Sequence, residues 1–159
     1  MTKGMKPPAE DRGSRAQTIL EFALIVPFVF VLLFAIVDFG SALDKRVTLQ
    51  HAVREGARAA AVHADPAVAK TTTVDQAQGL VTAAAVTVCF IDGNGNNKAD
   101  ALESVKVSLS YDYNYTVPFA SILRALGYSG TLKIPMTPSA TSALENDPAA
   151  GITFVECSP

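Results

Sequence analysis

The chain has 159 residues, the length of one compact domain rather than several. Apolar residues make up 49% and charged residues 18%, so the chain is richer in the first and poorer in the second than most soluble domains. A net charge of −2 argues against a general nucleic-acid binder. The sequence contains no phosphate-binding glycine loop ending in lysine, no GxSxG and no HExxH. The sequence has two histidines and no convincing pair of carboxylates in an apolar environment, so it favours a protein that is not an enzyme.

The N-terminal part is a short basic tail followed by a long apolar run. The stretch from residue 22 to residue 37, FALIVPFVFVLLFAIV, holds no charged or strongly polar residue, and residues 19–39 are interrupted only by Glu21 and Asp38. At 1.5 Å per residue, residues 19–39 make about 31 Å of helix, close to the hydrocarbon core of about 30 Å. We therefore expect one transmembrane helix, which Pro27 would kink or loosen locally without preventing it from spanning the bilayer.

The charges beside this run predict its orientation. Four basic residues precede it, against two acidic ones: Lys3, Lys6, Arg12 and Arg15, against Glu10 and Asp11. By the positive-inside rule, residues 1–16 are a cytoplasmic leader and the C-terminal domain is extracytoplasmic, with the chain in the inner membrane. A cleaved secretory signal peptide is the main alternative, because Gly40-Ser41-Ala42 supplies small residues. The apolar region is, however, longer than the 7 to 15 residues typical of a signal peptide.

Glu21 and Asp38 lie at the two edges of the apolar run. A carboxylate in the middle of a membrane costs about 2.5–3.5 kcal/mol, and less near the interface, so both fit interfacial boundary positions. The segment RAQTILEFAL, residues 15–24, also resembles a type IV prepilin processing site.

This resemblance implies that a prepilin peptidase cuts between Ala16 and Gln17, and that Glu21 and Phe22 become the fifth and sixth residues of the mature chain. The family usually has Gly where this chain has Ala16. The resemblance also suggests that Glu21 pairs with the amino terminus of a neighbouring subunit, which would offset burial of its charge.

The helix is expected to continue to residue 64, since residues 40–64 contain no proline and Pro66 follows. Apolar residues recur there at helical spacing, at Leu49, Val53, Ala57, Ala60 and Ala64. The strings EFALIVP (21–27), VDFG (37–40) and LQHAVREGARAA (49–60), in this order, resemble the TadE-like proteins, which are minor pilin-like, or pseudopilin, components of the Tad tight-adherence pilus. The motif residues are Asp38, Gly40, Arg54, Glu55, Gly56 and Arg58.

The TadE-like resemblance implies a structural or assembly role. The expected partners are the lipid bilayer, other pilin-like subunits, the Tad assembly machinery and prepilin peptidase. In the rival hypothesis, the helix is a plain anchor for an extracytoplasmic binding module.

Residues 65–159 are predicted to form the exported head. We expect a loop at 65–73, a short helix at 74–84, a strand at 85–91 and a long turn at 92–100. Apolar and aromatic residues alternate along 104–115, which predicts one strand, and 119–126 fits one or two helical turns. Weaker strands are expected at 131–134, 140–144 and 152–157. The predicted fold class is α+β, a long N-terminal transmembrane helix continuing into a small antiparallel-sheet head, as in pilin-like proteins.

Cys89 and Cys157 both fall in the exported head, where disulfides persist. One intrachain bridge would tie the C-terminus to the first strand and support a modest core. Free buried thiols or an intermolecular bridge are the alternatives. A metal site built on these two cysteines is not expected, because His51 and His63 lie on the helix about 120° apart around its axis.

The turn after the first strand carries clustered oxygen ligands of the kind calcium prefers. Asp92, Asn94, Asn96, Asp100 and Glu103 occupy positions 1, 3, 5, 9 and 12 of an EF-hand-type loop. Against calcium, position 6 is Asn97 instead of Gly, and the flanking elements are predicted to be strands instead of helices. A solvated hairpin loop without metal explains the same residues by turn chemistry. Calcium is therefore the only cofactor that the sequence suggests.

Overall fold

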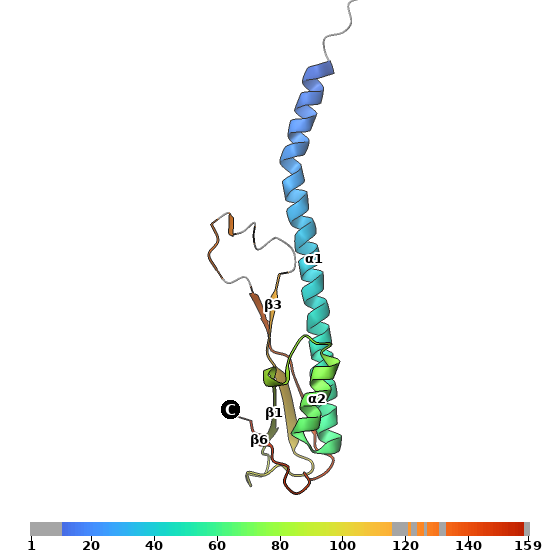
Figure 1. The fold of residues 1–159 in the computed structure, drawn as a ribbon, viewed down its shortest axis with the longest axis vertical. Helices are drawn as coiled ribbons and strands as arrows, with labels where there is room; N and C mark the ends of the chain where they lie inside the picture. The colour runs from blue at the N-terminus through green and yellow to red at the C-terminus, as the bar shows by residue number, and fades with distance from the viewer. Residues whose placement is uncertain (1–10, 116–120, 122–123, 126, 131–132, 158–159) are drawn as a thin grey trace, which may run out of the picture.

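The structure is a computed structural model that describes residues 11–115, 121, 124, 125, 127–130 and 133–157. Helix α1 spans Asp11–His63, 53 residues or roughly 80 Å, and the head packs against its C-terminal part (Figure 1). Pro27 lies inside α1 without ending it. The helix stops where predicted, because Ala64 takes a left-handed conformation (φ 47°) and the next helix begins at once.

Helix α2, Pro66–Gln76, occupies most of the segment predicted to be a loop, so that prediction was wrong. Asp65 caps this helix by accepting a hydrogen bond from the Ala67 amide (2.7 Å), and Pro66 fits the first helical position. The helix predicted at 74–84 was wrong as well. The chain turns at Gln78 and Gly79, both with positive φ, and only the short 3-10 helix η1, Ala83–Ala85, follows.

The main sheet has the strand order β5-β2-β1-β6. Strands β1 (Val86–Ile91), β2 (Ser104–Leu109) and β5 (Ser139–Ala143) pair antiparallel, close to the predicted positions. Strand β6 (Val155–Glu156) pairs parallel to β1, which makes the sheet mixed instead of purely antiparallel. The fold is nevertheless the predicted α+β arrangement of a long apolar helix followed by a small sheet.

The single strand predicted over residues 104–115 is divided in two. After Ser110, β3 (Tyr111–Asn114) leaves the main sheet and pairs antiparallel with β4 (Lys133–Met136) in a separate two-stranded sheet. The predicted alternation of burial continues across the break. The strand predicted at 131–134 is found in the described residues from Lys133 onward, and most of the turns predicted at 119–126 lie outside the described residues.

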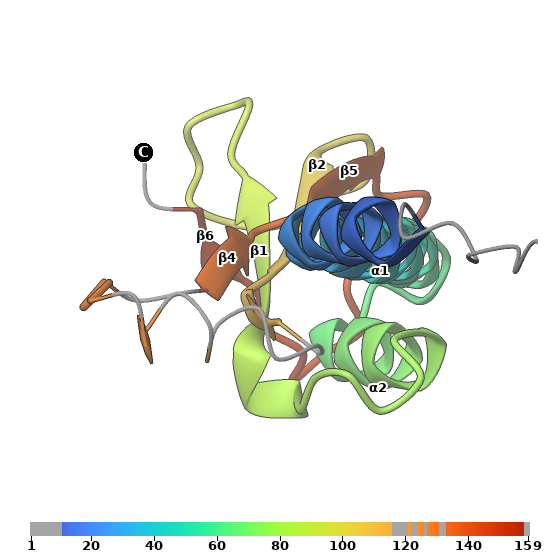
Figure 2. The ribbon, with the colours of Figure 1, turned by 90° about the horizontal axis from the view of Figure 1, so that it is seen from above.

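The core lies between the C-terminal part of α1, helix α2 and the main sheet. Viewed along the long axis, α1 and α2 lie side by side with the sheet next to them (Figure 2). The predicted helical stripe is the contact face of α1, since Leu49, Val53, Ala57, Ala60 and Ala64 are all at most 2% exposed. Among the described residues, none from 16 to 37 in the N-terminal part of α1 belongs to this core.

Candidate membrane and assembly surface

The N-terminal part of α1 exposes large apolar side chains around its circumference. Phe22, Phe28 and Phe39 are 66–72% exposed, and most of the aliphatic residues between them are exposed too. Soluble proteins rarely leave a contiguous apolar patch of this size uncovered. Among the described residues, this is the one helix long and apolar enough to cross a membrane, with a mean hydropathy of 2.8 in its most apolar window and none of that window buried. It is therefore a candidate membrane span.

The residues of the predicted processing site lie on the first described turns of α1. Ala16, Gln17, Glu21 and Phe22 are all exposed and helical. The Gln17 side-chain amide donates a hydrogen bond to Glu21 Oε1 (3.1 Å), as residues four apart on a helix can. In the uncut chain, the Ala16–Gln17 peptide bond is thus inside a continuous helix. A peptidase that needs an extended substrate would have to unwind this turn.

The head meets α1 at Asp38, where the apolar run ends. Asp38 is 3% exposed, and the hydroxyl of the fully buried Tyr113 donates to its carbonyl oxygen (3.3 Å) and its Oδ1 (3.4 Å). Lys45 Nζ lies 5.3 Å from the centroid of the Tyr113 ring, and Tyr115 packs edge-on against the same ring. Strand β3 is therefore held against the helix by a cation–π contact and hydrogen bonds as well as by packing.

Sequence reasoning identified Asp38 as a boundary residue but missed its partner. The signal was present in the three alternating tyrosines of 111–115, because a buried tyrosine usually needs a hydrogen-bond partner for its hydroxyl. Which acceptor it finds depends on how β3 crosses the helix.

The two glycines of the predicted motif in α1 have different surroundings. Gly56 is buried against α2, where a Cβ atom would lie 1.9 Å from Thr73 Oγ1 and 3.2 Å from the Ala69 carbonyl oxygen. Gly40, in contrast, is exposed and has open space around it. The close approach of α1 and α2 therefore requires a residue without a side chain at position 56.

Unlike Asp38, the charged motif residues between positions 54 and 58 lie at the surface. Arg54 and Arg58 are exposed, and Arg58 forms an ion pair with Glu55 (3.7 Å) one turn earlier. Exposed pairs of this kind contribute at most about 1 kcal/mol, so this pair explains little of the stability of the head. The three side chains are instead available to a partner.

Cys89 and Cys157 form the predicted intrachain disulfide, with their Cα atoms 4.9 Å apart. Cys89 lies on the buried strand β1, and the Cys157 amide donates to the Phe90 carbonyl oxygen (2.8 Å). The bridge ties the C-terminal strand β6 to β1, as the sequence predicted. Such a bond forms and persists in oxidising compartments.

The loop between β1 and β2 folds around the carboxylate of Asp92. Its Oδ1 accepts from the amides of Asn94 (3.1 Å) and Gly95 (2.6 Å), and its Oδ2 accepts from the amide of Asn97 (2.8 Å). The Asn97 amide is the main cause that lowers the pKa of Asp92 below its ordinary value. Asn97 has the left-handed conformation (φ 58°) that is expected of the residue at position 6.

The other predicted ligands lie in the same loop. Glu103 is 9% exposed and accepts from the amides of Gly93 (3.1 Å) and Asp100 (3.3 Å), while the side-chain amides of Asn94 and Asn96 donate to Asp100 Oδ2. Within the part of the chain that the structure describes, no three His, Cys, Asp or Glu side chains are grouped as metal ligands. The loop is thus held by its own hydrogen bonds, with asparagine oxygens among its acceptors.

Comparison with known proteins supports the resemblance drawn from the sequence. Residues 16–58 match the family model described as TadE-like protein. The matched range begins at the predicted processing site, includes Asp38 and Gly40, and ends at Arg58. No curated protein and no solved structure matches the chain.

Proposed function

We propose that this chain is a minor pilin-like component of a Tad pilus, because residues 16–58 match the TadE-like family model. It is anchored in the cytoplasmic membrane by the N-terminal part of α1 and presents the head on the outer side. It acts as a structural or assembly subunit, through contacts of its apolar helix with lipid and with other pilin-like helices.

The observation that carries this proposal is the division of α1 into two parts. Residues 49–64 are packed by the head, whereas residues 19–37 have no cover within the described structure. Lipid tails and the apolar helices of other subunits are the two surroundings that such a segment tolerates. The Cys89–Cys157 disulfide favours an outward-facing head.

The topology can be tested with the full-length chain carrying a C-terminal tag. We expect it to stay in the membrane pellet during carbonate extraction, and its tag to be digested when protease is added to spheroplasts. A cytoplasmic protein serves as the control for intact spheroplasts. Extraction by carbonate, or a tag protected until the cells are lysed, would contradict the proposal.

We also propose that prepilin peptidase cuts the chain between Ala16 and Gln17, and that Glu21 then pairs with the amino terminus of a neighbouring subunit. Mass spectrometry of the membrane-extracted protein should give a mature chain that starts at Gln17. Changing Glu21→Ala should leave insertion intact but impair assembly. A charged hydrogen bond contributes about 1.5–3 kcal/mol, so we expect the number of pili to fall by a factor of at least about ten.

Glu21→Gln separates charge from shape, since it keeps the size of the side chain and removes its charge. It should behave as Glu21→Ala does. Asp44→Ala is the matched control, because it removes an exposed carboxylate from the same helix outside the apolar run. Normal piliation of the Glu21→Ala strain would count against the pairing role, and an intact N-terminus would count against processing.

A second candidate function is calcium binding by the 92–103 loop, and the conformation around Asp92 favours it. Three amides already hold this carboxylate, and one of its roughly four acceptor positions remains for a cation. Its lowered pKa keeps it ionised down to pH values below its ordinary range. Oxygen atoms of Asn94, Asn96, Asp100 and Glu103 are close by in the sequence.

Calorimetric titration of the detergent-solubilised chain with calcium chloride tests this candidate. We expect a binding heat and a raised melting temperature, both lost in Asp92→Asn and retained in Asp75→Asn, which changes an exposed carboxylate on α2. Protonation of Asp92, as the pH falls through its lowered pKa, should weaken binding. If wild-type protein gives neither heat nor a melting shift, the loop is a metal-free hairpin.

A further inference from the structure

A groove lies between α1 and the β4–β5 segment, just beyond the apolar run. Its volume is about 520 Å³. Phe39, Leu43 and Arg46 line it from α1, and Ile134, Met136 and Pro138 line it from the opposite side. The Gln50 side chain closes its far end by donating to the Ser139 carbonyl oxygen (3.4 Å).

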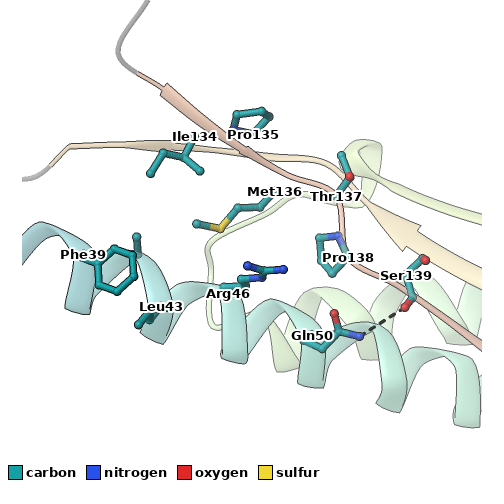
Figure 3. A pocket seen from close by; sticks show the side chains of 11 residues that line it. Phe39, Leu43, Arg46, Gln50, Ile134, Pro135, Met136, Thr137, Pro138 and Ser139 are labelled. Carbon is teal, nitrogen blue, oxygen red and sulfur yellow. Dashed lines mark hydrogen bonds between the residues drawn. The ribbon is translucent and has the colours of Figure 1, made fainter.

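One wall of the groove is continuous with the candidate membrane span. Phe39 and Leu43 are 66% and 44% exposed, and they extend the apolar surface of the span directly into the groove. Met136 and Ile134 face them from β4, so the end nearest the span is apolar on both sides (Figure 3). An acyl chain could enter here without leaving apolar surroundings.

Arg46 places a positive charge in this groove. Its side chain extends toward Met136 and Pro138 (Figure 3). Among the described residues, no carboxylate lies within ion-pair distance of it. Asp44, the nearest acidic residue in sequence, is two positions away and points to another side of the helix. The guanidinium group is therefore available for an anion, and two of its N–H groups can bind phosphate oxygens side by side.

The depth of Arg46 matches the headgroup layer. It is seven residues beyond Phe39, or about 10 Å along the axis, and the polar layer of a bilayer extends about 5–8 Å beyond the hydrocarbon. A flexible arginine side chain covers the remaining distance.

We propose that this groove binds an anionic phospholipid of the outer leaflet, with its phosphate on Arg46 and the upper part of an acyl chain against Phe39, Leu43 and Met136. The bound lipid would fill the space between helix and head and fix the height of the head above the membrane. This inference rests on the membrane topology of the proposed function.

Native mass spectrometry of the full-length chain tests the proposal. The protein is purified in micelles that contain equal amounts of phosphatidylglycerol and phosphatidylcholine with the same acyl chains, and the lipids it retains are counted. Wild-type protein should retain more phosphatidylglycerol. Arg46→Gln should lower the ratio of the two lipids by about fivefold, the factor expected for one basic residue at an anionic surface.

Arg54→Gln is the matched control, because Arg54 is an exposed arginine of the same helix outside the groove. This variant should retain the two lipids in the same ratio as the wild type. Leu43→Asn should lower retention of both lipids. Equal losses in the two arginine variants, or no preference in wild type, would overturn the inference. A dimer of the chain that Arg46→Gln dissociates, without lipid selectivity, would assign the groove to a second copy and overturn it too.

Carbonate extraction of the same variants separates this inference from the topology. Protein that stays in the membrane yet shows no lipid preference refutes the groove proposal alone. Protein that washes off the membrane refutes both.

Discussion

Removing the disulfide should lower the free energy of unfolding of the head by about 4 kcal/mol. The bridge joins residues 68 positions apart, and in the chain-entropy model a closed loop of this length restricts the unfolded chain by about that amount. The loop includes β2, β3, β4 and β5, so most of the head is constrained by it. For a domain whose whole stability is about 5–15 kcal/mol, this is a large fraction.

The C-terminal strand should respond first to this loss. Val155 is 73% exposed and β6 pairs with β1 over only two residues, so little except the bridge holds β6 in place. In the Cys89→Ala/Cys157→Ser variant, we expect fast amide exchange at 155–157 before the rest of the sheet unfolds.

Denaturant unfolding in detergent micelles, followed by near-ultraviolet circular dichroism of the tyrosines, gives the measurement. Tyr113 is fully buried in the head, whereas far-ultraviolet signals would be dominated by the detergent-stabilised helix. Wild-type protein treated with reductant is the control for the effect of the substitutions themselves. An unchanged midpoint in both samples would show that the bridge does not stabilise the head.

Changing Gly56→Val should destabilise the head by about 3 kcal/mol, the upper part of the range for overpacking a tight interface. The added Cβ would overlap Thr73 Oγ1, and Thr73 cannot move away easily because it is fully buried and donates to the Ala69 carbonyl oxygen (2.7 Å). Helices α1 and α2 would have to separate, which opens the core around Ala69.

Gly40→Val is the matched control, since it places the same side chain on the same helix where nothing lies within 4 Å. Its effect on the head should stay within about 0.5 kcal/mol. A double-mutant cycle with Gly56→Ala and Thr73→Ala tests the contact itself, because removing the hydroxyl should relieve part of the strain caused by the new methyl group. Equal melting temperatures of the head in the two valine variants would contradict this account of Gly56.

The sequence by itself determined the long helix, its apolar segment and the face on which the head packs. These features depend on the spacing of apolar residues and on the length of an apolar run, and both can be read from neighbouring positions in the sequence. The strand at 85–91 and the turn after it were predicted from local residue types in the same way. The cysteine pairing was predicted because two cysteines allow only one intrachain bridge.

Only the tertiary structure decided the remaining features. Helix α2 forms where Thr71, Thr72 and Thr73 have low helix propensity, because Asp65 and Pro66 start it and Ala69 and Thr73 pack against Gly56. The break at Ser110 and the bond between Tyr113 and Asp38 depend on how a strand crosses a helix 75 residues away in sequence. The groove at Arg46 also needs both walls in place, and residue spacing carries no information about such long-range contacts.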